Sequence, residues 1–265
     1  MAIGKAHAVW SVKYGERVVH KADVFYDYAQ YGLPDGDLDM DYNFWVLRAN
    51  DSIILMDTGY DITARDWLGE ISVTPTPDGL ALLGINPLEV KMVITSHFHY
   101  DHIGYLALFE RAEIVSGQKE YDYWFAKRDT NALEGEFTTD ENLVPVEKAM
   151  RDGRLHLITD EEEVFPGITV YQLGGHCPGE LVAKVDTDAG TLILASDAAH
   201  FYEQLEHEWP FFAFTDLNEM RNALSFILKL ASETGATIVP GHDARTRERF
   251  APAPGAAGAI ATVLA

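Results

Sequence analysis

Apolar residues recur along the chain in short runs that are bounded by turn residues and by stretches with helical spacing. Short apolar runs predict strands, and apolar positions three and four residues apart predict helices. The predicted strands are residues 43–47, 52–56, 91–95, 112–115, 155–158, 168–173, 181–185, 191–195 and 236–239. The predicted helices are residues 118–127, 144–151 and 218–231, of which the last has the clearest amphipathic pattern.

Less regular segments complete the predicted layout. Residues 7–20 alternate loosely and predict an opening hairpin that turns at Gly15 and Glu16. The acidic run at 160–163 predicts a solvated loop, and the Ala-, Pro- and Gly-rich residues 251–265 predict a flexible or loosely packed tail. No linker, composition break or repeat divides the chain, so we expect one domain over residues 1–265.

Histidine or aspartate directly follows an apolar strand at four places: 97–102, 176, 197 and 242. The densest stretch places three histidines and one aspartate within the six residues 97–102. In an extended segment, residues 97, 99 and 101 point the same way, while His102 opens a helix on a different side. This arrangement predicts two sets of ligands that face two neighbouring metal ions.

The chemistry of the cluster favours a metal site. A lone histidine such as His176 or His242 would more often be structural. Three imidazoles held this close would repel one another if charged, and burying them without a partner is costly. Nitrogen and carboxylate ligands suit Zn²⁺ best, with iron, manganese and cobalt as alternatives.

Three further segments could shape or support this site. Asp57 ends a predicted strand and precedes Thr58-Gly59, a pattern that favours a turn-capping aspartate over one that orients metal ligands. The aromatic loop 25–31 either packs its rings on the body or forms a lid over substrate, in which case Phe25, Tyr26 and Tyr28 contact the ligand. The polar segment 128–142 could also border the site.

Composition and charge limit the classes of molecule that the protein could bind. The chain has 265 residues, and 47% hydrophobic residues are enough for a sizeable core. Its 42 acidic and 20 basic residues give a formal net charge of −22. The four positive charges of two divalent cations leave −18. Such a charge repels phosphate backbones and anionic membranes, so we expect neither nucleic acid nor a membrane as a partner.

Cysteine use and the N-terminus suggest a location. Cys177 is the single cysteine, which excludes an intrachain disulfide and fits a reducing cytosol. The first ten residues lack a signal-peptide core, and no apolar run reaches membrane-spanning length. We therefore expect a cytoplasmic protein, for which a homodimer is compatible with the sequence. Cys177 is expected to pack beside the site and not to ligate metal.

The order of these residues resembles that of the metallo-β-lactamase superfamily. The motif His97-x-His99-x-Asp101-His102 is followed by a downstream histidine, a strand-end aspartate and a final Gly-His pair, and Asp57-Thr58-Gly59 also matches. The resemblance runs from about residue 43 to residue 243. It implies an α+β fold, the αββα sandwich of two mixed β-sheets flanked by helices, with the metals at one edge.

The resemblance also implies roles for the ligands. One metal would be held by His97, His99 and His176. The other would be held by Asp101, His102 and His242, with Asp197 bridging the two metals. A hydroxide that bridges the metals would attack a carbonyl carbon, and a metal would take the developing oxyanion.

Within the superfamily the chain looks most like the quorum-quenching N-acyl-homoserine lactonase branch. Chain length, the complete ligand set, Tyr100 as a substrate contact and the aromatic loop carry this likeness. Glu180 stands where members often have a second histidine. His200 stands where lactonases have a tyrosine, and Tyr202 follows. Asp101, His200 and Tyr202 are therefore the candidate catalytic residues, with simple packing as the alternative for His200.

Other functions remain as alternatives. A glyoxalase II-like thioesterase or a cyclic amide hydrolase would use the same metals. A glutathione thioester carries carboxylates and would need basic residues near the site, for which Arg65, Lys119, Lys127 and Arg128 are the candidates. The negative charge disfavours a phosphodiesterase, and the complete ligand set disfavours an inactive metal-binding scaffold.

Overall fold

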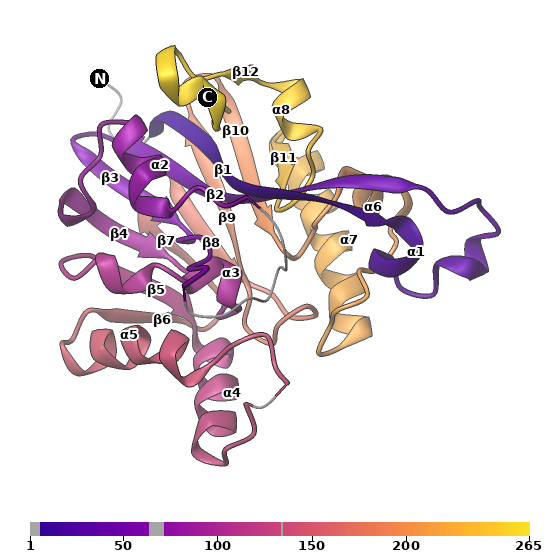
Figure 1. The fold of residues 1–265 in the computed structure, drawn as a ribbon, viewed down its shortest axis with the longest axis horizontal. Helices are drawn as coiled ribbons and strands as arrows, with labels where there is room; N and C mark the ends of the chain where they lie inside the picture. The colour runs from indigo at the N-terminus through magenta and orange to yellow at the C-terminus, as the bar shows by residue number, and fades with distance from the viewer. Residues whose placement is uncertain (1–5, 64–71, 134) are drawn as a thin grey trace.

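The computed structural model describes residues 6–63, 72–133 and 135–265. The strands are β1 (Ala6–His20), β2 (Asp37–Ala49), β3 (Ser52–Met56), β4 (Val90–Ile94), β5 (Glu113–Gly117), β6 (Leu155–Ile158), β7 (Glu161–Phe165), β8 (Ile168–Gln172), β9 (Leu181–Thr187), β10 (Gly190–Ser196), β11 (Thr237–Pro240), β12 (Ala251–Pro252) and β13 (Ala261–Val263) (Figure 1). The α-helices are α1 (Lys21–Val24), α2 (Thr76–Leu82), α3 (Tyr100–Ile103), α4 (Gln118–Asp129), α5 (Asp140–Arg151), α6 (Tyr202–His207), α7 (Leu217–Thr234) and α8 (Thr246–Arg249). Short 3₁₀ turns are η1 (Tyr28–Tyr31), η2 (Pro87–Glu89), η3 (Leu106–Leu108) and η4 (Gly255–Ala259).

The strands form two mixed sheets that meet along one edge. The first runs β6-β5-β4-β3-β2-β1, with β13 and then β12 added beyond β1. The second runs β7-β8-β9-β10-β11. Strand β1 meets β9 where Ala6 lies opposite Thr187. Each sheet combines parallel and antiparallel pairs, for example β3 with β4 and β2 with β3.

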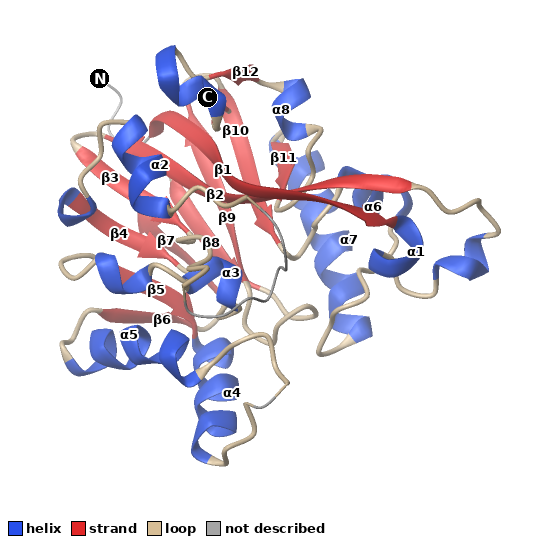
Figure 2. Cartoon of the chain, viewed as in Figure 1, coloured by secondary structure: helices blue, strands red, loops and turns tan. Residues whose placement is uncertain are grey.

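Three apolar clusters define the layers. The inner faces of the two sheets pack on each other, with Trp45 and Ile54 from one sheet and Leu194 from the other buried in one cluster. The outer face of the first sheet packs against α2, α4 and α5, and that of the second packs against α7. Figure 2 shows the helices around the outside of the strands. The predicted αββα sandwich is thereby confirmed.

Most predicted elements are present with small shifts at their ends. Helix α7 extends the predicted 218–231 at both ends. It begins after Asp216, whose side chain accepts hydrogen bonds from the backbone N–H groups of Asn218 and Glu219, and it ends at Gly235, whose φ is 70°. Among the described residues, no helix is long and apolar enough to cross a membrane.

Three predictions of local structure are wrong. Residues 7–20 form the single strand β1, because Gly15 lies at a register shift against β2 and not in a turn. The segment 160–163 is solvated as predicted, but it contributes to strand β7. Residues 251–265 are not a flexible tail, since β13 pairs with β1 and Leu264 is buried. Main-chain pairing holds this segment and needs no strong side-chain pattern.

Strands β1 and β2 extend beyond the sandwich as a two-stranded arm toward α1 and α6 (Figure 1). The register pairs Arg17 with Met40 and His20 with Asp37. Met40 lies beside the final ligand loop, where it bridges to Asp243. The arm thus forms part of the wall of the cavity described next.

Candidate metal centre

The predicted ligands converge because four strands end at the same edge of the sandwich. The loops after β4, β8, β10 and β11 carry them, and α3 begins within the first of these loops. The carboxyl ends of strands in α/β structures commonly carry functional residues in this way. The structure brings together every predicted ligand, and all are buried: His97, His99, Asp101, His102, His176, Asp197 and His242.

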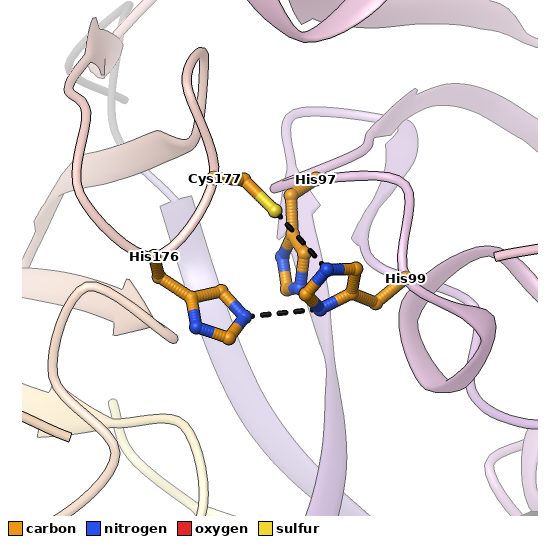
Figure 3. Close-up of side chains that lie close together, drawn as sticks. All are labelled: His97, His99, His176 and Cys177. Carbon is orange, nitrogen blue, oxygen red and sulfur yellow. Dashed lines mark hydrogen bonds between the residues drawn. The ribbon is translucent and has the colours of Figure 1, made fainter. Parts of the chain in front are cut away.

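The first ligand set surrounds one oxygen of Asp197. His99 Nδ1 lies 3.0 Å from His176 Nε2 (Figure 3). His176 Nε2 lies 3.4 Å from Asp197 Oδ2, and His97 Nε2 lies 3.9 Å from the same oxygen. These atoms define a small space bounded by three imidazoles and one carboxylate oxygen.

The second set surrounds the other oxygen of Asp197. His102 Nε2 is 3.4 Å from Asp197 Oδ1, and His242 Nε2 is 3.0 Å from it. His102 Nε2 also lies 3.5 Å from Asp101 Oδ2. Asp197 therefore presents one oxygen to each ligand set, which is the geometry of a carboxylate that bridges two cations.

Hydrogen bonds select the tautomers that leave Nε2 free to bind metal. His176 Nδ1 lies 2.9 Å from the carbonyl of Ala213, and His242 Nδ1 lies 2.8 Å from the carbonyl of Asp41. A carbonyl can only accept, so both Nδ1 atoms are donors and both Nε2 atoms keep their lone pairs. Metal-binding histidines use this arrangement to hold their rings in place.

The residues fit a pair of divalent cations. Ligand atoms on a tetrahedral metal with bonds of about 2.1 Å lie about 3.4 Å apart, which matches the separations of 3.0 to 3.9 Å. Three buried ligand atoms, His97 Nε2, His102 Nε2 and Asp197 Oδ1, have no hydrogen-bond partner. Burial, with the neighbouring His102 and His99, holds the pKa of His97 well below its usual range, so this imidazole is neutral and able to bind metal.

Asp57 orients a ligand, so the favoured prediction of a mere turn cap is wrong. Its fully buried carboxylate accepts from His102 Nδ1 at 2.9 Å, from Ser96 Oγ at 2.8 Å and from Ser96 N at 2.7 Å. Ser196 Oγ donates to it from the opposite sheet at 3.2 Å. Asp57 has a left-handed φ of 66°, a conformation that commonly marks functional sites.

Glu120 is a supporting residue that the sequence pattern did not reveal. Its buried carboxylate accepts from the backbone N–H of Phe98 at 2.9 Å and of Gly179 at 3.3 Å, and from Trp124 Nε1 at 2.6 Å. It therefore ties the loop after β4 to the loop after β8. Burial raises the pKa of Glu120 to about 7. A Cβ at Gly179 would lie 2.1 Å from Glu120 N, so only glycine permits this approach.

Two further buried residues, Cys177 and Glu180, lie beside the candidate ligands. Cys177 Sγ lies 3.2 Å from His99 Nε2, the nitrogen opposite the one that faces His176 (Figure 3). Burial raises the pKa of this thiol well above its usual range. Glu180 is also fully buried, and burial, together with Asp197, raises the pKa of its carboxyl well above its usual range.

A cavity of about 410 Å³ opens above the ligands. Its walls come from the arm, from α3 and from two loops: Arg17, Met40, Tyr42, Tyr100, Phe137, Phe211, Phe212 and Ala213. A wider cavity of about 980 Å³ shares His99, Phe137, His176, Phe212 and Ala213 with it and continues toward Tyr123, Trp124, Lys127 and Phe214. Large apolar side chains thus surround a polar floor, as is usual for small-molecule sites.

The predicted substrate contacts are only partly in place. Tyr100 lines the cavity. Tyr26 lines neither of the two cavities; it packs edge-on against Phe214, a wall residue of the wider cavity. Phe25 and Tyr28 are buried against Trp209 and line neither cavity, so the prediction that they contact substrate is wrong for both. Loop 25–31 is therefore packed on the body.

Other wall residues come from two segments, 128–142 and 211–213, that contributed no residue to the predicted substrate contacts. Phe137 belongs to the polar segment 128–142, for which bordering the site was one of the two interpretations, and it lines the cavity. The 211–213 segment was not singled out, because a short aromatic run in a loop carries no spacing signal.

The two candidates that follow Asp197 lie in different places. His200 lines the cavity, with Nε2 3.0 Å from Asp197 Oδ2 and its ring stacked on Phe211 at 3.5 Å between centroids. Tyr202 points away. Its hydroxyl accepts from Thr246 Oγ1 at 3.4 Å, and its ring lies beneath the Arg249 guanidinium at 3.5 Å. The prediction that Tyr202 reaches substrate is therefore wrong in this structure.

The structure gives little support for binding of an anionic thioester by the basic residues named above. Arg65 lies outside the described residues. Lys127 lines the wider cavity but pairs with Glu136, and Arg128 pairs with Asp140. Their charges are largely neutralised by these partners.

A family model for the metallo-β-lactamase superfamily matches residues 39–242. The chain belongs to this superfamily. A relative from Azorhizobium caulinodans, the N-acyl homoserine lactonase AttM, is 32% identical over 178 residues, which are 65% of each chain. The match thus covers slightly less than two thirds of that relative.

Solved structures agree with this assignment. The structure of a quorum-quenching N-acyl homoserine lactone lactonase has a TM-score of 0.75 at 22% identity, covering 92% of this chain and 95% of the other. The dizinc quorum-quenching lactonase AidC has a TM-score of 0.66 at 21% identity, covering 92% of each chain. At these identities the likeness establishes the fold.

Proposed function

We propose that this chain is a dinuclear-metal hydrolase that opens lactone rings, with N-acyl-homoserine lactones as its substrate class. One observation carries the proposal: Asp197 directs its two carboxylate oxygens at two separate sets of buried ligands. Two metals that share a carboxylate are typical of hydrolytic sites. The relatives named above, which are lactonases, support the choice of substrate.

The two ligand sets would each hold one cation. His97, His99 and His176 would bind the first, Asp101, His102 and His242 would bind the second, and Asp197 would contact both. The neutral, nitrogen-rich first set suits Zn²⁺ best. When bound, the pair supplies Lewis acidity at the substrate carbonyl and a nucleophile that is available at neutral pH.

The chain's own residues would position the metals and the ring. Asp57, Ser96 and the Asp41 carbonyl hold the outer nitrogens of the ligands, so the imidazoles cannot turn away. Asp101 is both a ligand and part of the cavity lining, which places its carboxylate beside bound substrate. Phe211 and Phe212 would exclude water from the apolar side of the ring.

His200 would act through Asp197. Its Nε2 is engaged by the Asp197 carboxylate, and its Nδ1 is buried without a partner. Neither nitrogen is therefore presented to the open cavity. We infer that His200 is a positioning residue that holds the bridging carboxylate and does not contact the reacting atoms, as a catalytic residue would.

The test is a substrate panel run on the same sample whose metal content is measured. Metal-loaded protein should open N-acyl-homoserine lactones, producing the hydroxy acid with one added water by mass spectrometry. It should also contain close to two metals per chain. If all homoserine, γ- and δ-lactones stay intact while a thioester or cyclic amide is hydrolysed, the proposed substrate class is wrong.

We also propose that the protein acts in the cytoplasm. The single cysteine is buried and free, which suits a reducing compartment. Fractionation of cells that express the protein at its natural level tests this, and recovery outside the cytoplasmic fraction would contradict it.

A further inference from the structure

One cation faces the cavity without an acidic partner. Arg17 lines the smaller cavity, and its guanidinium lies 5.8 Å from the centre of the Tyr42 ring. The Tyr42 ring in turn packs edge-on against His242. Arg17 forms no ion pair with any other residue in the described ranges 6–63, 72–133 and 135–265. It therefore stands at the outer end of a stack that leads to a metal ligand.

The strand register explains why this arginine is left unpaired. Arg17 pairs with Met40, and Gly15 pairs with Tyr42, so these four residues share the face of the arm that turns to the cavity. The acidic residues Glu16, Asp39 and Asp41 alternate onto the opposite face. There Arg247 contacts Asp41 at 2.6 Å and Glu16 at 3.6 Å.

The other charges around the cavity strengthen the contrast. Asp101 and Asp197 line the same cavity but are committed to the proposed metals. Lys127, in the adjoining cavity, is paired with Glu136. In a chain of net charge −22, distant acids are screened over about 8–10 Å. The nearby Arg17 guanidinium, which has no ion-pair partner among the described residues, should therefore outweigh the distant acids in its effect on a charged substrate at the cavity entrance.

We propose that Arg17 forms a carboxylate-binding subsite, so that the preferred lactones carry a carboxylate on the substituent attached to the ring. The guanidinium offers two parallel N–H donors, which match the two oxygens of a carboxylate. Met40 and Tyr42 would contact the apolar part of the substituent. This inference rests on the proposed lactonase activity for its substrate, and it deepens that proposal.

The experiment compares two homoserine lactones whose acyl chains have equal length, one ending in a carboxylate and the other in a methyl group. The metal-loaded wild-type protein should prefer the carboxylated substrate by about tenfold in kcat/KM. Arg17→Gln should remove this preference by lowering kcat/KM for the carboxylated substrate far more than for the methyl-ended one. Arg17→Lys should retain part of the preference, because lysine keeps the positive charge but lacks the two parallel N–H donors of the guanidinium.

Arg48→Gln is the matched control. Arg48 is also exposed, and its guanidinium likewise lies 5.8 Å from an aromatic ring, that of Trp10, but it does not line either cavity. Its substitution should change neither substrate. Thermal unfolding of every variant checks that the fold is intact.

The outcomes separate the two proposals. If the lactones are opened without discrimination, or if Arg17→Gln slows both equally, the Arg17 subsite is refuted and the lactonase proposal stands. If neither lactone is opened, the lactonase proposal fails. Calorimetric titration of the two ring-opened acids into wild type and Arg17→Gln then decides the subsite by itself: equal affinity for both proteins refutes it.

Discussion

The floor and the walls of the cavity are built on different principles. Every ligand in the floor is buried, and the outer nitrogen of His102, His176 and His242 has a hydrogen-bond partner of its own. In the walls, the Phe137 side chain is 42% exposed and that of Phe212 is 48% exposed. The wall residues lie on the arm, on α3, on α4 and on loops, and the Arg17 guanidinium lies 5.8 Å from the centre of the Tyr42 ring.

This contrast separates the reaction from the substrate. The floor holds its atoms through short polar contacts that lose much of their value when one partner is removed. The walls contribute apolar area and one charge, and they can change without disturbing the ligands. Changes in the floor should therefore abolish chemistry, while changes in the walls should alter which lactone is preferred.

The largest effect is expected from Asp197→Ala, which removes the carboxylate shared by both ligand sets. Metal content should fall from about two per chain toward one or fewer, and activity should fall by at least about 100-fold. Elemental analysis and kcat/KM on one preparation measure both. Asp186→Ala, on β9 away from the ligands, is the control. Retention of two metals with normal activity would show that Asp197 does not bridge.

Removing the metals should lower the stability of the folded protein, because the floor would lose the cations that its ligand atoms face. Without cations, the clustered ligand atoms of His97, His102 and Asp197 have no compensating partner. Metals present at about a thousandfold above their dissociation constants contribute about 4 kcal/mol, so a chelator should lower Tm by about 10 °C. Scanning calorimetry with and without added Zn²⁺ checks this. An unchanged Tm would contradict a metal-filled floor.

A smaller loss is expected from Asp57→Asn, which keeps the size of the side chain and tolerates the left-handed φ of 66°. The amide accepts less strongly from His102 Nδ1 and adds a donor where only an acceptor fits. Metal affinity should fall by about 10–100-fold. Competition with a fluorescent chelator measures this, with Asp188→Asn in the β9–β10 turn as the control. An unaltered affinity would restore the turn-cap interpretation of Asp57.

The smallest effect is expected at the walls, from Phe212→Ala. Its ring is half exposed, so truncation should cost about 1 kcal/mol of substrate binding. KM for an N-acyl-homoserine lactone should rise about fivefold with kcat nearly unchanged. Leu82→Ala, on α2 and 43% exposed, should change neither constant. A large fall in kcat for Phe212→Ala would break the separation between floor and walls.

The sequence by itself predicted the candidate metal ligands, because their spacing is local and each follows a recognisable apolar strand. Residues 97–102 direct their side chains toward two different sides within a short stretch of chain. Residues 176, 197 and 242 each follow the end of a strand, and these strands end at the same edge of the sandwich. The superfamily follows from the order of these residues. Most strands and the helix α7 were also predictable, since burial imposes a period on their side chains.

Only the tertiary structure decided which residues support the ligands and which contact substrate. Asp57 and Glu120 matter because chain segments far apart in sequence bring His102, Phe98 and Gly179 to their carboxylates. Phe25 and Tyr28 look like a lid in sequence, yet Trp209 packs against them in the core. Arg17 faces the cavity because of strand register. Such contacts depend on long-range packing, which leaves no periodic trace along the chain.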